Sequence, residues 1–245
     1  MVNRFHIFFL IIPCFVLSQT LRNTGLKATY KIKPNSYQKE NNEKEDDISQ
    51  IKNILSNDYL IMIEESSKIM TFTLVYKNNK KHFSRNSFIT PEYLNANQTL
   101  FMTNFKDEIH FADYKNKIFI NHYEFQGKKY NLINEEIIDD WEITSETKLI
   151  NAFLCYKVVK KGNKSQFPII WFAPELSFPI GPFDFNNFPG MVLEVNYKIL
   201  TVFCEKIEFE NEYLDFGPIT EPQGISITNE EFKKIFDKAI GGLTE

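Results

Sequence analysis

The sequence predicts a mainly β protein: an antiparallel curved sheet, half-barrel or sandwich-like, with a C-terminal helix packed on it. Many short segments alternate apolar and polar residues with the period of a strand. Near the C-terminus, a helix-capping sequence is followed by apolar residues at helical spacing. The chain holds 24 Phe and only 9 Gly, which indicates an aromatic-rich core or cavity and favours the curved sheet.

The first strands follow from strict alternation. In residues 25–33, apolar side chains occupy every second position, and Pro34 closes the strand. A second strand is expected over 68–77, with a turn at Asn78-Asn79. Residues 35–50 are polar without periodicity and predict a loop, whereas 47–65 fit a short helix or an irregular segment equally well.

The remaining strands bring the expected number to about ten. In residues 150–160, every second residue from Ile150 to Val158 is apolar, which predicts one strand with one apolar face. Residues 109–113 and 117–125 predict a hairpin around 114–116. Further strands are expected over 128–133, 141–148, 167–173, 191–195 and 199–209.

The C-terminal helix has both a start and a stop signal. Thr228 and Glu231 form a capping box, in which each side chain satisfies a free backbone N–H of the first turn. Gly241-Gly242 ends the helix. The apolar stripe that should lie on the sheet consists of Phe232, Ile235, Phe236, Ala239 and Ile240.

The N-terminus predicts export. Arg4 precedes an apolar block over 6–17, and Val16 and Ser18 are small enough for cleavage before Gln19. The block is shorter than the roughly 20 apolar residues of a membrane span, so residues 1–18 fit a cleavable signal peptide rather than an anchor. We expect a single domain over 19–245 that is periplasmic or extracellular and not an integral membrane protein.

Charge and motifs exclude several functions. The formal net charge of −4 argues against a nucleic-acid partner, because such binding neutralises phosphates with basic side chains. The sequence has no nucleophile elbow, metalloprotease motif or phosphate-binding glycine loop, and it suggests no cofactor. His110 and His122 could face each other across a hairpin beside Glu124 and bind a metal, but exposed strand histidines are the favoured interpretation.

Cys155 and Cys204 both lie in apolar stretches that read as strands. In an oxidising compartment they are candidates for a disulfide. Two buried thiols that pack as small hydrophobes are the alternative. Sequence leaves this choice open, because it does not give the distance between the two Cα atoms.

Several motifs between Trp141 and Val195 appear in a characteristic order. They are Trp141-Glu-Ile143, Lys148-Leu-Ile150 with Cys155, Trp171 to Glu175, Gly181-Pro182 with Phe185, and Pro189-Gly190. This arrangement resembles the GLPGLI family of exported Bacteroidetes proteins, whose members generally have no assigned activity. Gly25 and Tyr30 are similar to the family's first strand. The name-giving motif falls at 187–192, where Asn187, Phe188, Met191 and Val192 are substitutions.

The motif region is also the candidate binding site. Its residues are Trp171, Glu175, Gly181, Pro182, Phe185, Pro189, Gly190 and Glu194. Pro189-Gly190 can force a sharp corner before the strand at 191. Glu175 and Glu194 are carboxylates close to this corner in sequence, and Glu175 would be the polar group that holds a ligand. A structural corner is the favoured interpretation, and a ligand or partner site is the alternative.

Two functions remain as the main hypotheses. The first is a non-catalytic carrier or binder of a hydrophobic ligand, for which an open apolar cavity would be the sign. The second is a protein-interaction module of a periplasmic or surface complex, for which an exposed apolar patch or free strand edge would be the sign. We do not expect an enzyme, since no catalytic constellation is visible.

Overall fold

The protein is described by a computed structural model over residues 25–35, 64–65, 67–87, 108–135, 140–162 and 167–241. The predicted signal peptide and nearly all of the predicted loop at 35–50 lie outside these residues. The segment 47–65, whose conformation the sequence left open, also lies outside them except for its last two positions.

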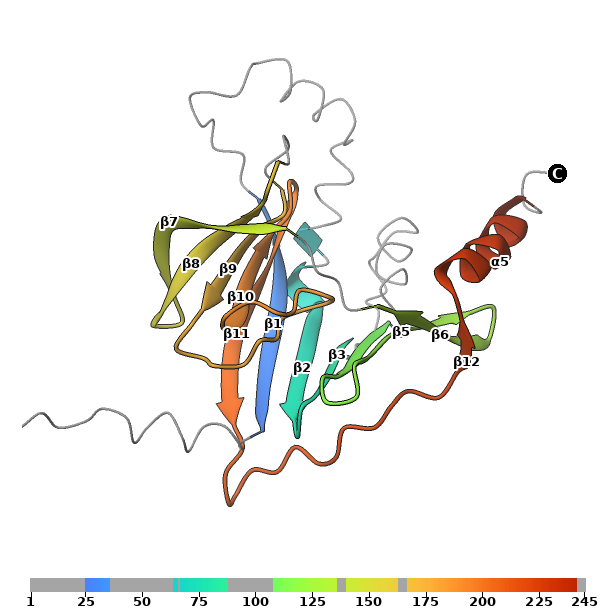
Figure 1. Ribbon diagram of the computed structural model, residues 1–245, viewed down its shortest axis with the longest axis horizontal. Helices are drawn as coiled ribbons and strands as arrows, with labels where there is room; N and C mark the ends of the chain where they lie inside the picture. The colour runs from blue at the N-terminus through green and yellow to red at the C-terminus, as the bar shows by residue number, and fades with distance from the viewer. Residues whose placement is uncertain are drawn as a thin grey trace, which may run out of the picture.

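One sheet of 12 strands organises the described part of the chain (Figure 1). Its order is β12-β6-β5-β4-β3-β2-β1-β11-β10-β9-β8-β7. Neighbouring strands pair antiparallel except β12 and β6, which are parallel. The strands are β1 (Leu26–Pro34), β2 (Thr71–Lys77), β3 (Lys80–Arg85), β4 (Ile109–Asp113), β5 (Ile118–Phe125), β6 (Lys128–Asn134), β7 (Trp141–Ile150), β8 (Phe153–Lys160), β9 (Ile169–Ala173), β10 (Met191–Asn196), β11 (Leu200–Phe209) and β12 (Ile225–Ile227). The predicted fold class is confirmed.

Two strands were not predicted, and one predicted strand is wrong at its start. β3 reads as polar and β12 has only 3 residues, so neither gives a clear pattern. The chain turns at Asn151 and Ala152, whose φ angles are 51° and 67°. Ile150 therefore ends β7 instead of beginning β8, and on β8 it is Cys155 that is fully buried while Leu154 is exposed.

The sheet is strongly curved, as Figure 1 shows. Lys148 on β7 and Glu194 on β10 form an ion pair of 2.6 Å although their strands are three places apart. In a flat sheet, strands at that separation would be roughly 14 Å apart. The β7–β8 turn also reaches β11, where the Asn151 side-chain amide donates to the Cys204 carbonyl oxygen at 2.8 Å. The end of the sheet at β7 thus folds back over its middle.

The two faces of the sheet differ. We call one the loop face, because the chain segment 174–190 packs on it. The pairing registers place two rows of inward side chains on this face: Val158, Ile170, Val195, Val202 and Ile32 form one, and Phe83, His110 and Asn121 form the other. Most of these residues are buried. On the opposite face of the middle strands, Lys27, Thr29 and Lys31 of β1 are only partly buried.

The C-terminal helix α5 (Asn229–Gly241) packs near the other end of the sheet, beside β6 (Figure 1). The predicted capping box is confirmed: Glu231 N–H donates to Thr228 Oγ1 at 3.2 Å, and Thr228 N–H donates to Glu231 Oε2 at 2.7 Å. Phe232 stacks on Tyr123 at 5.6 Å and meets Tyr130 at 5.7 Å. No helix of the described residues is both long and apolar enough to cross a membrane.

Candidate functional site

The candidate site is built around residues 174–190, the segment between β9 and β10 that we call the motif loop. Its last turn is tight, because Gly190 N–H donates to the Phe188 carbonyl oxygen at 2.7 Å. A Cβ at Gly190 would overlap the Ala173 carbonyl oxygen, and the φ of 157° also favours glycine. The sharp corner predicted at Pro189-Gly190 is confirmed, and β10 leaves it directly.

The middle of the motif loop is a second tight turn. Phe185 N–H donates to the Pro182 carbonyl oxygen at 3.2 Å, and a Cβ at Gly181 would overlap the Phe185 carbonyl oxygen. Phe183, in the same turn, has a φ of 50°, which is uncommon for a bulky residue. Its ring meets Phe83 at 4.9 Å and Phe72 at 5.9 Å. The turn thus places one aromatic side chain against the loop face.

Lys81 on β3 attaches the motif loop to the sheet. The side chain is 1% exposed, and its ammonium donates to the Phe183 carbonyl oxygen at 2.5 Å and to Asn186 Oδ1 at 2.8 Å. Burial lowers the pKa of Lys81 to about 8, against the opposing effect of the nearby Asp184 carboxylate. Tyr30 on β1 adds a further contact, since its hydroxyl donates to the Val192 carbonyl oxygen at 2.6 Å.

Asp184 joins the loop to β4 and β5. His110 Nδ1 lies 2.9 Å from its Oδ1, and the Asn121 amide donates to its Oδ2 at 2.9 Å. Burial raises the pKa of Asp184, but the hydrogen bond and charge of His110 outweigh this and lower it to about 2. His110 Nε2 also lies 3.0 Å from a Glu108 oxygen. Burial lowers the pKa of His110, but the two carboxylates outweigh it and leave the pKa raised.

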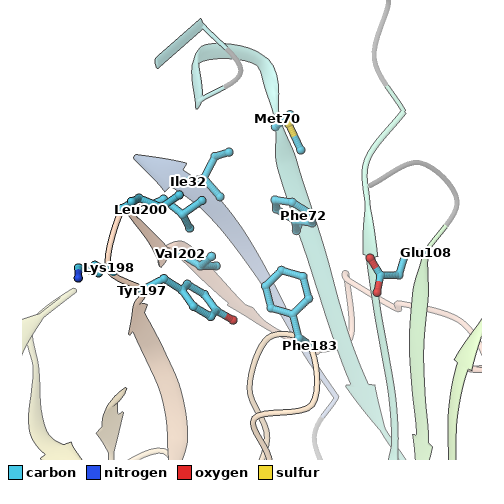
Figure 2. Close-up of a pocket in the computed structure, with 10 residues that line it drawn as sticks. Ile32, Met70, Phe72, Glu108, Phe183, Tyr197, Lys198, Leu200 and Val202 are labelled. Carbon is cyan, nitrogen blue, oxygen red and sulfur yellow. The ribbon is translucent and has the colours of Figure 1, made fainter. Parts of the chain in front are cut away.

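Beside the motif loop lies an apolar cavity of about 600 Å³. Figure 2 shows the Phe183 ring beside Tyr197 and below Phe72, with the Glu108 carboxylate on the side away from Tyr197. The apolar wall comes from β1, β2, β11, the β10–β11 turn and the motif loop: Ile32, Met70, Phe72, Phe183, Tyr197, Ile199, Leu200 and Val202. Glu108 and Lys198 are the charged residues that line it.

A second cavity of about 340 Å³ lies across the motif loop and is more polar. Phe183 and Tyr197 line both cavities. The other lining residues are Trp141, Lys160, Pro168, Asp184, Phe185, Asn186 and Phe188. Burial raises the pKa of Tyr197, as do the charges of Asp184 and Glu108, so its phenol stays neutral near pH 7.

The structure divides the site residues predicted from the sequence into two groups. Gly181, Pro182, Phe185, Pro189 and Gly190 all shape the motif loop, and Phe185 lines the second cavity. The second group, Trp171, Glu175 and Glu194, lines neither cavity.

Trp171 and Glu194 form a separate cluster with Lys148. The Lys148 ammonium lies 4.2 Å from the centre of a Trp171 ring and 2.6 Å from a Glu194 oxygen. Trp171 and Glu194 are a cross-strand pair of β9 and β10. The indole Nε1 of Trp171 is buried with no hydrogen-bond partner in the part of the chain that the structure describes. Glu175 is exposed.

The residues that the sequence did not reveal are Lys81, His110, Phe183 and Asp184 as parts of one site. Phe183 and Asp184 lie inside the Gly181 to Phe185 motif, so the motif was the available signal. Lys81 and His110 are more than 70 positions away in sequence. Only the strand order brings them to the loop.

The suggested pairing of His110 with His122 is wrong, and so is the favoured interpretation of two exposed histidines, because both residues are buried. His110 is paired with Asn121, and His122 with Ile109, so the two rings point to opposite faces of the sheet. His122 Nδ1 contacts Asn131 Oδ1 at 2.7 Å on the face away from the motif loop. The described residues contain no group of three or more His, Cys, Asp or Glu that could hold a metal ion.

The two cysteines are free thiols in the structure, and both are buried. Burial raises the pKa of Cys155 to about 11 and that of Cys204 to about 12. This arrangement corresponds to the alternative of two small apolar side chains in the core. The two lie near enough for the charge of a Cys155 thiolate to raise the pKa of Cys204 further.

Comparison with known proteins identifies the fold only. No protein-family model matches the chain, and no curated protein matches it. Solved structures of PNGF-II in the C2 and P21 space groups superpose with a TM-score of 0.52 over 86% of this chain, at 13% and 12% identity. This chain spans about a third of their length, 32% and 33%. Fold and site together define a curved β-sheet protein with an apolar cavity beside the motif loop.

Proposed function

We propose that this protein is an exported, non-catalytic binder or carrier of a hydrophobic ligand, and that the 600 Å³ cavity is its binding site. The observation that carries the proposal is the cavity itself. Its volume lies within the range of roughly 300–1,000 Å³ typical of small-molecule sites. Its wall is built mostly from apolar side chains, so the occupant that gains most from entering is an apolar molecule.

The polar groups near the cavity favour binding over chemistry. Glu108 lies against His110, and Asp184 is held by His110 and Asn121. A general acid or base needs a proton that it can exchange with a substrate near neutral pH. The pKa of about 2 keeps Asp184 ionised, and its bonds to the sheet give it a positioning role for the motif loop.

The test is the binding of a fluorescent apolar probe such as N-phenyl-1-naphthylamine. Val202 lines the cavity, so Val202→Trp should fill it and abolish the rise in fluorescence. Val75 is on the opposite face of β2 and is partly exposed, so Val75→Trp is the matched control and should bind like the wild type. Equal binding by both variants, or no saturable binding by the wild type, would reject the proposal.

Export is tested separately. If residues 1–18 are a cleaved signal peptide, the mature protein recovered from the periplasm or medium begins at Gln19. Edman sequencing or intact-mass measurement determines this directly. A protein found in the cytoplasm that still carries Met1 contradicts the export part of the proposal and leaves the cavity part untouched.

A protein-interaction module is the second candidate, and β7 favours it. This strand lies at one end of the sheet and pairs with β8 alone among the described strands. Ile143 and Leu149 on it are 52% and 71% exposed. A free edge with apolar side chains is a surface on which an extended segment of another chain can pair. Native mass spectrometry of the protein from its own cells should then show a stoichiometric partner that Ile143→Lys releases.

A further inference from the structure

The two cavities beside the motif loop share a wall. Phe183 and Tyr197 line both of them. Phe183 holds its position with a left-handed backbone, and its ring lies edge-on to Phe83 and to His110, at 4.9 and 5.4 Å. Backbone conformations of this kind cost of order 1–3 kcal/mol and cluster at ligand sites. Phe183 and Tyr197 therefore stand where the apolar cavity and the polar cavity meet.

The polar cavity offers both hydrogen-bond acceptors and donors. The Asp184 carboxylate is 38% exposed, and its pKa of about 2 keeps it an acceptor at every physiological pH. Asn186 Oδ1 accepts hydrogen bonds from the Lys81 ammonium and from the Tyr114 hydroxyl, at 2.8 Å each. The amide NH₂ of Asn186 is left to donate. Lys160 lines the same cavity as a further cation.

Trp141 adds a flat apolar surface to these polar groups. The residue lines the cavity, and its ring is 5.7 Å from Phe188 and 6.4 Å from Phe185, so the motif loop supports it from one side. An indole ring beside hydrogen-bonding groups suits a molecule that has C–H faces and hydroxyl edges. A sugar ring is such a molecule.

We propose that the two cavities form one binding site for an amphiphile: the apolar chain occupies the larger cavity, and a hydroxylated head group occupies the smaller. A hydroxyl both donates and accepts, so it can satisfy Asp184 and Asn186 at once. A carboxylate head group is attracted by Lys160 but repelled by Asp184, to which it cannot donate, and a quaternary ammonium can neither donate to Asp184 nor accept from Asn186. This inference rests on the proposed function and names the class of ligand for the same site.

The test compares three probes with the same octyl chain and different head groups. Octyl glucoside, octanoate and octyltrimethylammonium are titrated below their micelle concentrations against protein that carries N-phenyl-1-naphthylamine. We expect octyl glucoside to displace the fluorophore about tenfold or more tightly than either other probe, since only its hydroxyls can both donate to Asp184 and accept from Asn186. Free glucose, which lacks the chain, should displace nothing.

A variant assigns the preference to the smaller cavity. Trp141→Leu keeps an apolar side chain but removes the flat indole surface, so the preference for octyl glucoside over the other two probes should fall severalfold. Leu149→Ala, in the same strand at a highly exposed position, is the control and should keep the full preference. Urea denaturation of each variant shows whether it is folded under the assay conditions.

The outcomes separate this inference from the proposed function. Suppose that the fluorophore binds, that Val202→Trp abolishes its binding, and that the three octyl probes compete equally. The amphiphile inference is then overturned, while the proposed binding of a hydrophobic ligand still stands. Octanoate binding tightest, or an unchanged preference in Trp141→Leu, overturns it as well. If the fluorophore does not bind at all, both fail together.

Discussion

Replacing Gly190 by alanine should destabilise the protein through a steric overlap in addition to a backbone penalty. The new Cβ would overlap the Ala173 carbonyl oxygen, and the backbone φ of 157° is unfavourable for alanine. Gly127 is the matched control, because it also has a positive φ, 72°, but a Cβ there meets nothing within 4 Å. Both substitutions cost the backbone penalty, and only Gly190→Ala adds the overlap.

The expected magnitudes follow from these two effects. A non-glycine residue in a left-handed conformation costs roughly 1–2 kcal/mol, which is the expected loss for Gly127→Ala. Overpacking against a fixed neighbour adds about 1–3 kcal/mol. Backbone, unlike a flexible side chain, cannot move aside cheaply. Gly190→Ala should therefore lose about 2–5 kcal/mol of the free energy of unfolding.

Urea denaturation followed by far-UV circular dichroism measures both losses under the same conditions. Because the corner positions the motif loop, Gly190→Ala should also weaken binding of the apolar probe, whereas Gly127→Ala should not. Equal losses of stability in the two variants would refute the reasoning, since the overlap would then contribute nothing. An unchanged Gly190→Ala protein would mean that the corner is not as tight as described.

Three further results are expected. Tyr30→Phe should lose about 1–2 kcal/mol, because it leaves the buried Val192 carbonyl oxygen without a donor, as chemical denaturation would show. The raised pKa of His110 means that the folded state binds its proton more tightly than the unfolded state. The contribution of His110 to the free energy of unfolding should be complete below pH 6.5 and decline as pH rises through the folded-state pKa. His110→Gln should remove this pH dependence. Cys155 and Cys204, with raised pKa values and buried thiols, should react with a thiol reagent only after unfolding; no reaction in denaturant without reductant would instead indicate a disulfide.

The local patterns of the sequence predicted most of the sheet. β4 has the expected bounds, because its turn residues and apolar run agree. β3 was missed because Lys81 and His82 give it a polar reading, although Lys81 is almost completely buried. Burial of a lysine depends on acceptors that other segments supply, and no local rule contains that information.

The motif was easier to find than the cavity. Gly181, Pro182 and Pro189-Gly190 are recognisable because turns need particular residues at particular positions. The cavity needs the register of β1, β2 and β11, which is set by contacts between distant parts of the chain. The histidine pairing failed for the same reason: a shift of one residue in register moves a side chain to the other face.

The place of β1 in the sheet has a consequence for the order in which the protein can fold. β1 lies between β2 and β11, so its second neighbour is a strand that is synthesised more than 160 residues later. Until residue 200 and those after it are available, β1 has one unpaired edge and the cavity lacks a wall. Contacts at such a separation are formed slowly. A chain synthesised from its N-terminus therefore stays incompletely folded through most of its synthesis, and the same pairing that completes the core also completes the wall of the cavity.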